Sequence, residues 1–264
     1  MITLSGLDLA VAAVLVVGLA LLSHRHRLGL GKKILIAALR TVVQLLLVGQ
    51  VLRLVFALSN PFWMVLVAAV MLLAAGHEVQ ARQHRRLAGL AGLRVGFLSM
   101  FLSSFTVTLF GLAIIIQPLP WYAPQYAIPL LGMLLGNTMN GVALAMERVT
   151  GAVWQQKAVI EQRLLLGATP VEALLEIRRD AMRSGMIPIV NAMAAAGLVS
   201  LPGMMTGQIL SGTPPIEAVK YQILIMFLIA GGCGVGILTA LSLLTRLLFD
   251  DRARLRLDKL SRPG

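Results

Sequence analysis

Residues 221–248 read YQILIMFLIAGGCGVGILTALSLLTRLL, and this stretch decides the class of fold. Its only charged residue is Arg246, near the end. A helix needs about 20 predominantly apolar residues to cross a bilayer, so the stretch predicts a transmembrane helix. Of all 264 residues, 58% are hydrophobic and only 13% are charged, against about 25% charged in a soluble domain. This composition excludes an ordinary water-soluble domain.

Further apolar runs of comparable length precede this stretch. Two of them need a second argument, because 61–76 is short and 36–58 contains Arg40 and Arg53. Counting both, we predict an all-α integral membrane protein with about seven transmembrane helices, and the spans before 221–248 are 3–22, 36–58, 61–76, 95–116, 127–146 and 188–210.

The basic residues support seven spans. Lys and Arg number 23 against 11 Asp and Glu, which gives a net charge of +12. If all seven runs cross the membrane, 20 of the 23 cations fall on one side, in segments 23–33, 77–94, 147–187 and from Arg246 onward. Cytoplasmic loops collect Lys and Arg, so the N-terminus is expected outside and the C-terminus in the cytoplasm. The charge thus predicts topology and contact with lipid, and not binding to nucleic acid.

The longest segment between spans, 147–187, predicts a cytoplasmic helical hairpin between the fifth and sixth spans. Its first helix covers 158–166, and Gly167-Ala168 forms the bend. Thr169 and Glu172 then have the spacing of a capping box, with Pro170 at the first helical position. The restarted helix carries one apolar stripe, made of Ala173, Leu174, Ile177 and Ala181.

This hairpin resembles the segment with which permease subunits of ATP-binding-cassette (ABC) importers contact their ATPase. Glu161 lies six residues before Gly167 and Ile177 lies ten after it, as in that segment. The Ala-Ala and Leu-Pro pairs of the importer pattern are absent, and a solvated connecting hairpin is the alternative. The residues expected to couple to an ATPase are Glu161, Gly167, Ala168, Thr169, Glu172, Arg178 and Arg179.

A second resemblance covers nearly the whole chain. Residues 132–148 (GMLLGNTMNGVALAMER), 164–169 (LLLGAT) and 197–210 (GLVSLPGMMTGQIL) resemble the FetB-type iron-export permease family, whose plant relatives are linked to aluminium tolerance. The resemblance implies that residues 1–264 form a single transmembrane permease domain of an ABC exporter. It also implies a metal cation such as iron as substrate, a separate cytoplasmic ATPase, and a multi-pass location in the bacterial cytoplasmic (inner) membrane. Seven spans are few for a complete ABC transporter, so we expect a permease homodimer with two ATPase subunits.

Polar and thioether side chains recur along the fifth and sixth spans. Polar residues within spans usually face the interior of the helix bundle or a cavity, so these residues are candidates for a translocation path. Pro202-Gly203 predicts a break in the sixth span, as at many transport sites. The alternative is packing, since Gly132 and Gly136 permit a close helix contact and methionine fills irregular space. The path candidates are Met133, Asn137, Asn140, Glu147, Ser200, Met204 and Gln208.

Metal ligands and nucleotide-binding motifs are sparse. His77 and Glu78, at the end of the third span, are candidates for gathering a cation, and a solvated helix cap is the alternative. The histidines do not have the spacing of a zinc site. The chain has no G-x-x-x-x-G-K-[ST] sequence to hold a nucleotide's phosphates. We therefore expect a non-catalytic transport subunit that binds no cofactor itself, with ATP and Mg²⁺ in the partner ATPase.

Two other functions remain open at this point. One is a self-sufficient secondary transporter, in which Glu147, Arg53 or Glu78 would carry the coupling charge. The other is a membrane scaffold whose cytoplasmic hairpin recruits a partner.

Overall fold

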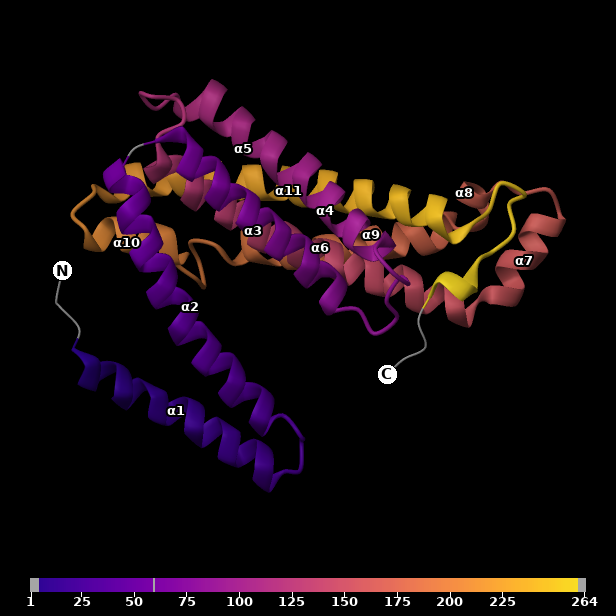
Figure 1. Cartoon of the computed structure of the whole chain (residues 1–264), viewed down its shortest axis with the longest axis horizontal. Coiled ribbons are helices and arrows are strands. Elements are labelled where there is room, and N and C mark those ends of the chain that lie inside the picture. Colours follow the sequence, from indigo (N-terminus) through magenta and orange to yellow (C-terminus); the bar gives the residue numbers. More distant parts are fainter. Residues whose placement is uncertain (1–4, 59, 261–264) are drawn as a thin grey trace. The chain divides into compact units, whose positions relative to one another are not determined.

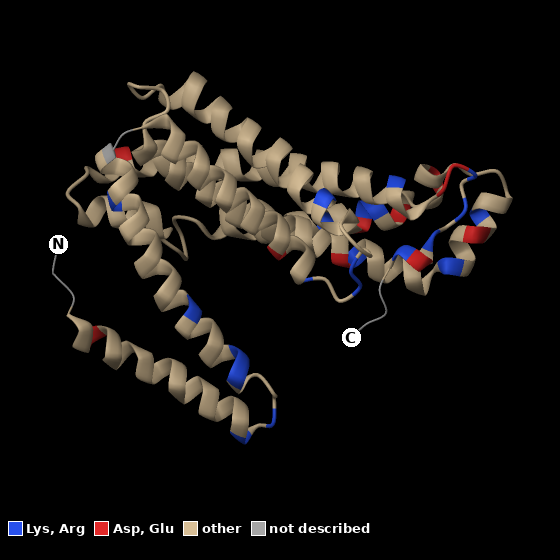
Figure 2. Ribbon diagram, in the orientation of Figure 1, with Lys and Arg blue, Asp and Glu red and all other residues tan. Residues whose placement is uncertain are grey.

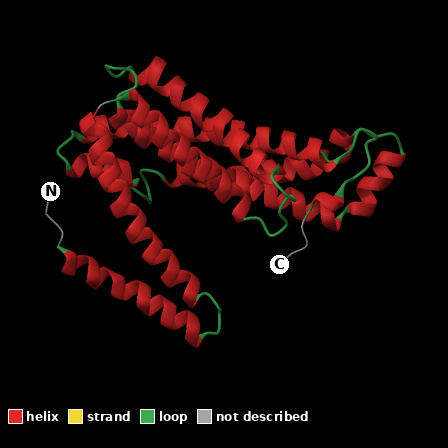
Figure 3. Cartoon of the chain, viewed as in Figure 1, coloured by secondary structure: helices red, strands yellow, loops and turns green. Residues whose placement is uncertain are grey.

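A computed structural model describes residues 5–58 and 60–260 of the chain. Within them the chain forms helices joined by loops, with no β-strand (Figure 3). The long helices in Figure 1 are α1 (Gly6–Arg25), α2 (Gly31–Leu58), α3 (Pro61–Ala81), α4 (Ala91–Met100), α6 (Pro124–Gln155), α9 (Leu175–Ala195) and α11 (Pro215–Leu248). The shorter elements are the π-helical η1 (Phe101–Phe105) and η2 (Gly111–Ile116), α5 (Thr106–Phe110), α7 (Lys157–Leu165), α8 (Pro170–Ala173), α10 (Gly203–Leu210) and the 3₁₀ turn η3 (Leu257–Lys259).

Six helices of the described residues are long and apolar enough to cross a membrane. They are α1, α2, α3, the continuous run Ala91–Ile116, α6 and α11. The all-α membrane fold is therefore confirmed, and the two runs that needed a second argument, 36–58 and 61–76, lie within α2 and α3. The exact number of crossings and the orientation in the membrane stay predictions.

The remaining predicted span, 188–210, is not one continuous helix. Helix α9 ends at Ala195, a loop covers 196–202, and α10 begins at Gly203. Gly197 has φ +82°, a conformation that favours glycine, and Pro202 has no N–H to continue a helix. The break that Pro202-Gly203 predicts is therefore present, and it extends seven residues back to Ala196.

The chain divides into two compact units, Met1–Asn60 and Pro61–Gly264. The first contains a helical hairpin of α1 and α2. In its turn Arg27 and Gly29 have φ +53° and +69°, and the hydroxyl of Ser23 accepts a hydrogen bond from the backbone N–H of Leu30 (3.2 Å). The apolar side chains of both helices are largely exposed, as expected for surfaces that meet lipid tails.

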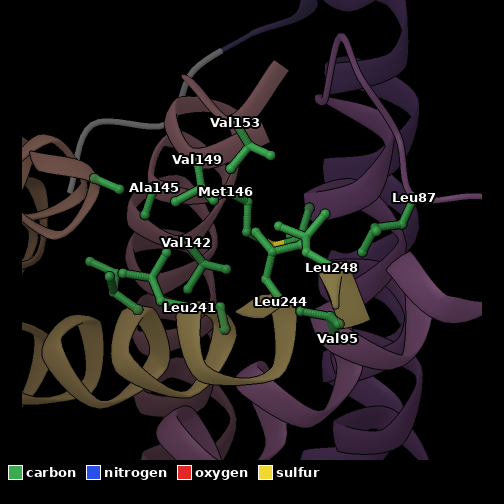
Figure 4. Packing of buried hydrophobic residues seen from close by; sticks show 14 of the residues in the cluster. Leu87, Val95, Val142, Ala145, Met146, Val149, Val153, Leu241, Leu244 and Leu248 are labelled. Carbon is green, nitrogen blue, oxygen red and sulfur yellow. The ribbon is translucent and has the colours of Figure 1, made fainter. Parts of the chain in front are cut away.

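The core of the second unit lies where α6, α9 and α11 pack together, with α3 and α4 beside them. Figure 4 shows its central side chains, among them Val142, Met146, Val149, Leu241 and Leu244, all buried. Apolar packing of this kind gives the bundle one defined arrangement.

Glycines set the closest helix crossings. A Cβ atom added at Gly185 of α9 would lie 2.6 Å from the carbonyl oxygen of Gly141 in α6, and one at Gly96 of α4 would lie 2.5 Å from that of Gly76 in α3. By contrast, a Cβ at Gly136 would meet nothing within 4 Å. Helix α6 therefore makes its tightest contact at Gly141, one turn beyond the Gly132/Gly136 pair that the sequence suggested.

Candidate functional site

Most charged residues of the second unit gather at one end of its helix bundle (Figure 2). Three of the predicted cytoplasmic segments lie there: the loop after α3, the α7–α8 region, and the residues after α11. We call this the charged end. Within this unit these basic segments lie at one end of the bundle, and their side of the membrane stays a prediction.

The hairpin at the charged end has the predicted bend and cap. Gly167 has φ +91°. The Thr169 hydroxyl accepts a hydrogen bond from the backbone N–H of Glu172 (3.3 Å), and Glu172 Oε2 accepts one from the backbone N–H of Thr169 (2.8 Å). That backbone bond and a second from the Thr169 hydroxyl lower the pKa of Glu172. The cap therefore holds Glu172 as a carboxylate.

Most of the second arm of the hairpin and the first part of the following span form one helix, α9. After the single turn of α8, helix α9 begins at Leu175 and runs past Pro188 without a break to Ala195. The predicted boundary at residue 188 is therefore not a helix boundary.

The apolar stripe of the hairpin is buried, as predicted. Its four residues are at most 7% exposed and belong to the core cluster: Ala173, Leu174, Ile177 and Ala181. The hairpin therefore packs against the rest of the second unit rather than extending freely into solvent.

The predicted coupling residues form two groups. Glu161, Gly167, Thr169 and Glu172 are exposed on the hairpin, and Ala168 lies in its bend. Arg178 donates to the Ser242 hydroxyl of α11 (3.5 Å), and Arg179 pairs with Glu176 (2.9 Å), so both contact their own subunit.

The apolar tip of this hairpin was not among the predicted site residues. Leu165 and Leu166, directly before the bend, are each 87% exposed. In the sequence, the three consecutive leucines directly before Gly167 could have indicated this exposed apolar tip.

Two adjoining cavities bring several path candidates together. The terminal cavity, of 280 Å³, lies at the end of the bundle opposite the charged end, where α6 begins and α10 leads into α11. The middle cavity, of 220 Å³, lies deeper along α6. Met133, Met204 and Ile225 line both. Gln208 lines the terminal cavity and Asn137 the middle one.

The middle cavity lies about halfway along the predicted membrane span 127–146, of which Asn137 is the eleventh residue. The Asn137 side chain donates through Nδ2 to the carbonyl oxygen of Met133 (2.8 Å).

The remaining path candidates lie elsewhere. Asn140 accepts a hydrogen bond from Arg82 (2.5 Å), and Glu147 accepts one from the backbone N–H of His84 (2.9 Å). Both thus hold the loop after α3 against α6. Ser200 is exposed in the loop between α9 and α10, where its hydroxyl donates to the carbonyl of Ala195 (3.4 Å). The predicted polar face of α6 is therefore divided between the middle cavity and the charged end.

Besides these two cavities, a groove lies between α6 and α9 at the charged end. This groove, of 860 Å³, is lined by groups of both signs, including Glu147, Glu176 and Arg183. An ion pair joins α6 to α9 there, between Arg148 and Asp180 (2.7 Å). The Gly141–Gly185 crossing lies between this groove and the middle cavity, because Leu144 and Ser184 line the groove whereas Asn137 and Ile189 line the cavity.

Gln222 of α11 was likewise not among the predicted site residues. This residue is only 9% exposed and lines the middle cavity, and its Oε1 atom has no hydrogen-bond partner among the described residues. The Oε1 atom of Gln208 is likewise buried without a partner. The one sequence feature that could have indicated Gln222 is that it is the single amide side chain in the apolar stretch 221–248.

His77 and Glu78 do not gather further ligands around them. Glu78 pairs with Arg82 (3.3 Å), and His77 is exposed. In the described part of the chain, no three His, Cys, Asp or Glu side chains lie close enough to hold a metal ion together.

The fold and the cavities define a multi-pass membrane protein, and comparison with known proteins places it in a family. The model of an uncharacterised protein family, UPF0014, matches residues 6–249. The chain belongs to this family.

Named relatives cover most of the chain. It is 32% identical over 260 residues to the probable iron export permease protein FetB of Escherichia coli, covering 97% of this chain and 96% of that protein. A UPF0014 membrane protein of Synechocystis is 48% identical over 202 residues, covering 76% and 77% of the two chains. The protein ALUMINUM SENSITIVE 3 of Arabidopsis thaliana is 33% identical over 240 residues, covering 90% and 85%. No solved structure matches.

Proposed function

We propose that this protein is the membrane permease subunit of an ABC exporter that moves a metal cation, such as iron, out of the cytoplasm. Its relatives support a permease, because FetB is named a probable iron export permease. In the proposal, ATP and Mg²⁺ bind to a separate cytoplasmic ATPase, and this chain catalyses no reaction itself.

The observation that carries the proposal is the seam between α6 and α9. A hollow lies on each side of the Gly141–Gly185 crossing, the groove at the charged end and the middle cavity beyond it. Transporters use alternating access, in which helices move against one another around a central site. Separation of α6 from α9 at these two glycines would join the two hollows into one path.

The hairpin supplies a connection between this seam and an ATPase. Leu165 and Leu166 at its tip offer an exposed apolar contact, and α9 runs from the hairpin to the seam without interruption. An ATPase that moves the tip would therefore move α9 against α6.

The assembly we propose is a homodimer of the permease with two ATPase subunits, in the bacterial cytoplasmic membrane. The loop at 196–202 supports contact with a second subunit, because its Leu198 and Val199 side chains are 90% and 87% exposed in the single chain. Irregular backbone at this depth is tolerated where protein or water covers it, and not where it faces lipid.

A reconstitution experiment tests the proposal. The chain is placed in liposomes with and without a candidate P-loop ATPase co-expressed with it, and anaerobic Fe²⁺ flux is measured with and without ATP. We expect flux only when ATPase and ATP are both present.

The other outcomes identify the alternatives. Flux without any ATPase would contradict the proposal and indicate a secondary transporter. Stable ATPase binding without flux of Fe²⁺ or another metal cation would indicate a scaffold.

A further inference from the structure

Two buried amide oxygens in the membrane region have no hydrogen-bond partner among the residues that the structure describes. They are Oε1 of Gln208 in α10 and Oε1 of Gln222 in α11. Burying a polar atom without a hydrogen bond costs free energy, and nearly all such atoms in proteins are paired. An unpaired oxygen beside a cavity therefore indicates a group that the cavity receives.

The two oxygens belong to residues around one continuous region. Gln208 lines the terminal cavity and Gln222 the middle cavity, and the two cavities adjoin at Met133 and Met204. The amide nitrogen of Asn137 is occupied by the carbonyl of Met133, which leaves its oxygen as the acceptor on the middle cavity.

The chemistry of these walls favours a cation. The described residues that line the two cavities include no charged side chain. Amide oxygens and thioether sulfurs offer lone pairs to a metal ion, and thioethers favour softer ions over Mg²⁺ and Ca²⁺. An anion would find no positive group.

We propose that Gln208, Gln222, Met133 and Met204 form a binding site for a transition-metal dication such as Fe²⁺, where the terminal and middle cavities adjoin. The site deepens the proposed export function and rests on it. Its ligands are all neutral, so the ion is held without a countercharge and binding is weak and reversible. A transported ion must be able to leave its site, so weak binding suits this role.

Neutral ligands also give the site a distinctive pH dependence. Carboxylate, histidine and cysteine ligands bind protons in competition with metals, so their metal affinity falls in acid. Amides and thioethers do not titrate in the physiological range. The affinity of this site for Fe²⁺ is therefore constant between about pH 6 and pH 8.

The test measures Fe²⁺ binding to the full chain in lipid nanodiscs, without ATPase, by anaerobic equilibrium dialysis. We expect wild-type protein to bind Fe²⁺ in excess Mg²⁺. Gln208→Leu, Gln222→Leu and Met204→Leu should each weaken binding by about tenfold or more. Gln125→Leu is the matched control, because Gln125 lines the terminal cavity but is exposed, and it should bind as wild type does.

A second variant separates a ligand from a packing residue. Gln222→Glu keeps the size of the side chain and adds a carboxylate, so it should bind Fe²⁺ more tightly at pH 8 and lose this gain as the pH falls. If Gln222→Leu does not elute from a sizing column as the wild-type protein does, it has not folded correctly. Gln222→Glu and Gln208→Leu then provide the test.

Three results would overturn the site: no Fe²⁺ binding by wild-type protein, unchanged affinity in both glutamine-to-leucine variants, or binding that weakens in acid and disappears in His77→Ala. ATP-dependent flux that persists without such binding would remove this site and leave the proposed function standing. Fe²⁺ binding without Fe²⁺ flux in the reconstituted complex would contradict the proposed export function and leave the binding site standing.

Discussion

Gly185 determines how closely α9 approaches α6. Its hydrogen atom faces the carbonyl of Gly141, and a Cβ there would lie 2.6 Å from that oxygen and 2.8 Å from Cδ1 of Ile237. The sequence contains many glycines, 25 in all, and it does not mark which of them form crossings. Only the packing of α6, α9 and α11 selects Gly141 and Gly185, because residues far apart in the chain meet there.

Gly185→Ala should therefore destabilise the protein, because overpacking a tight contact costs about 1–3 kcal/mol. Gly136→Ala is the control on α6, where an added Cβ meets nothing within 4 Å and alanine favours a helix by about 1 kcal/mol. Thermal unfolding in detergent should show a lower midpoint for Gly185→Ala and an equal or higher one for Gly136→Ala. Equal midpoints for Gly185→Ala and wild type would contradict a tight seam.

The cap of the hairpin predicts a shifted titration. Hydrogen bonds from Thr169 lower the pKa of Glu172 from the ordinary value of 4.5. A lowered carboxyl pKa means that the cap stabilises the fold fully above that value and loses its contribution as the pH falls through the folded pKa.

Thr169→Pro suits the backbone φ of −69° at this position and removes both donors, whereas Thr169→Ser keeps them. A ¹³C carboxyl titration should move the Glu172 midpoint up toward 4.5 in Thr169→Pro and leave it low in Thr169→Ser. An unchanged midpoint in Thr169→Pro would show that these bonds do not hold the carboxylate.

Among the elements, the hairpin followed from its sequence more closely than the sixth span did. The bend at Gly167, the Thr169–Glu172 cap and the buried stripe are local features, set by backbone conformation and helical spacing, and the structure contains all three. The continuity of α9 from Leu175 to Ala195 was not evident, because charge marks where a helix meets water and not where it ends.

Gly167→Val should uncouple the ATPase from transport. Valine is strained at φ +91°, so the bend would change shape and the tip would no longer move α9. We expect ATP hydrolysis by the complex to continue while the Fe²⁺ moved per ATP falls by about tenfold or more.

Gly167→Asn is the matched control, since asparagine tolerates positive φ, and it should keep most of the coupling. A wild-type ratio of Fe²⁺ to ATP in the valine variant would remove the hairpin from the coupling pathway.

At the scale of the whole molecule, the sequence was sufficient for the membrane fold and the family, because both depend on apolar runs and extended motifs. It grouped Met133, Asn137, Asn140 and Glu147 on one helical face, but partners from other elements divide that face. Arg82 donates a hydrogen bond to Asn140, and the backbone N–H of His84 donates one to Glu147. Residues of α10 and α11 complete the walls of the cavities that Met133 and Asn137 line. Such partners come from tertiary packing, which helical periodicity does not contain.

If the α6–α9 seam opens and closes during transport, the accessibility of a thiol placed on either side of it should change with nucleotide. The chain has one cysteine, Cys233, so Cys233→Ala gives a cysteine-free background. Into it, Asn137→Cys places a thiol in the middle cavity and Ser184→Cys one in the groove.

In proteoliposomes with the ATPase, the labelling rates of the two thiols by a membrane-impermeant reagent are compared before and after trapping with ATP and vanadate. We expect trapping to change the two rates in opposite directions, as access passes from one hollow to the other. Rates that nucleotide leaves unchanged at both positions, in a complex that still transports Fe²⁺, would contradict opening of the seam.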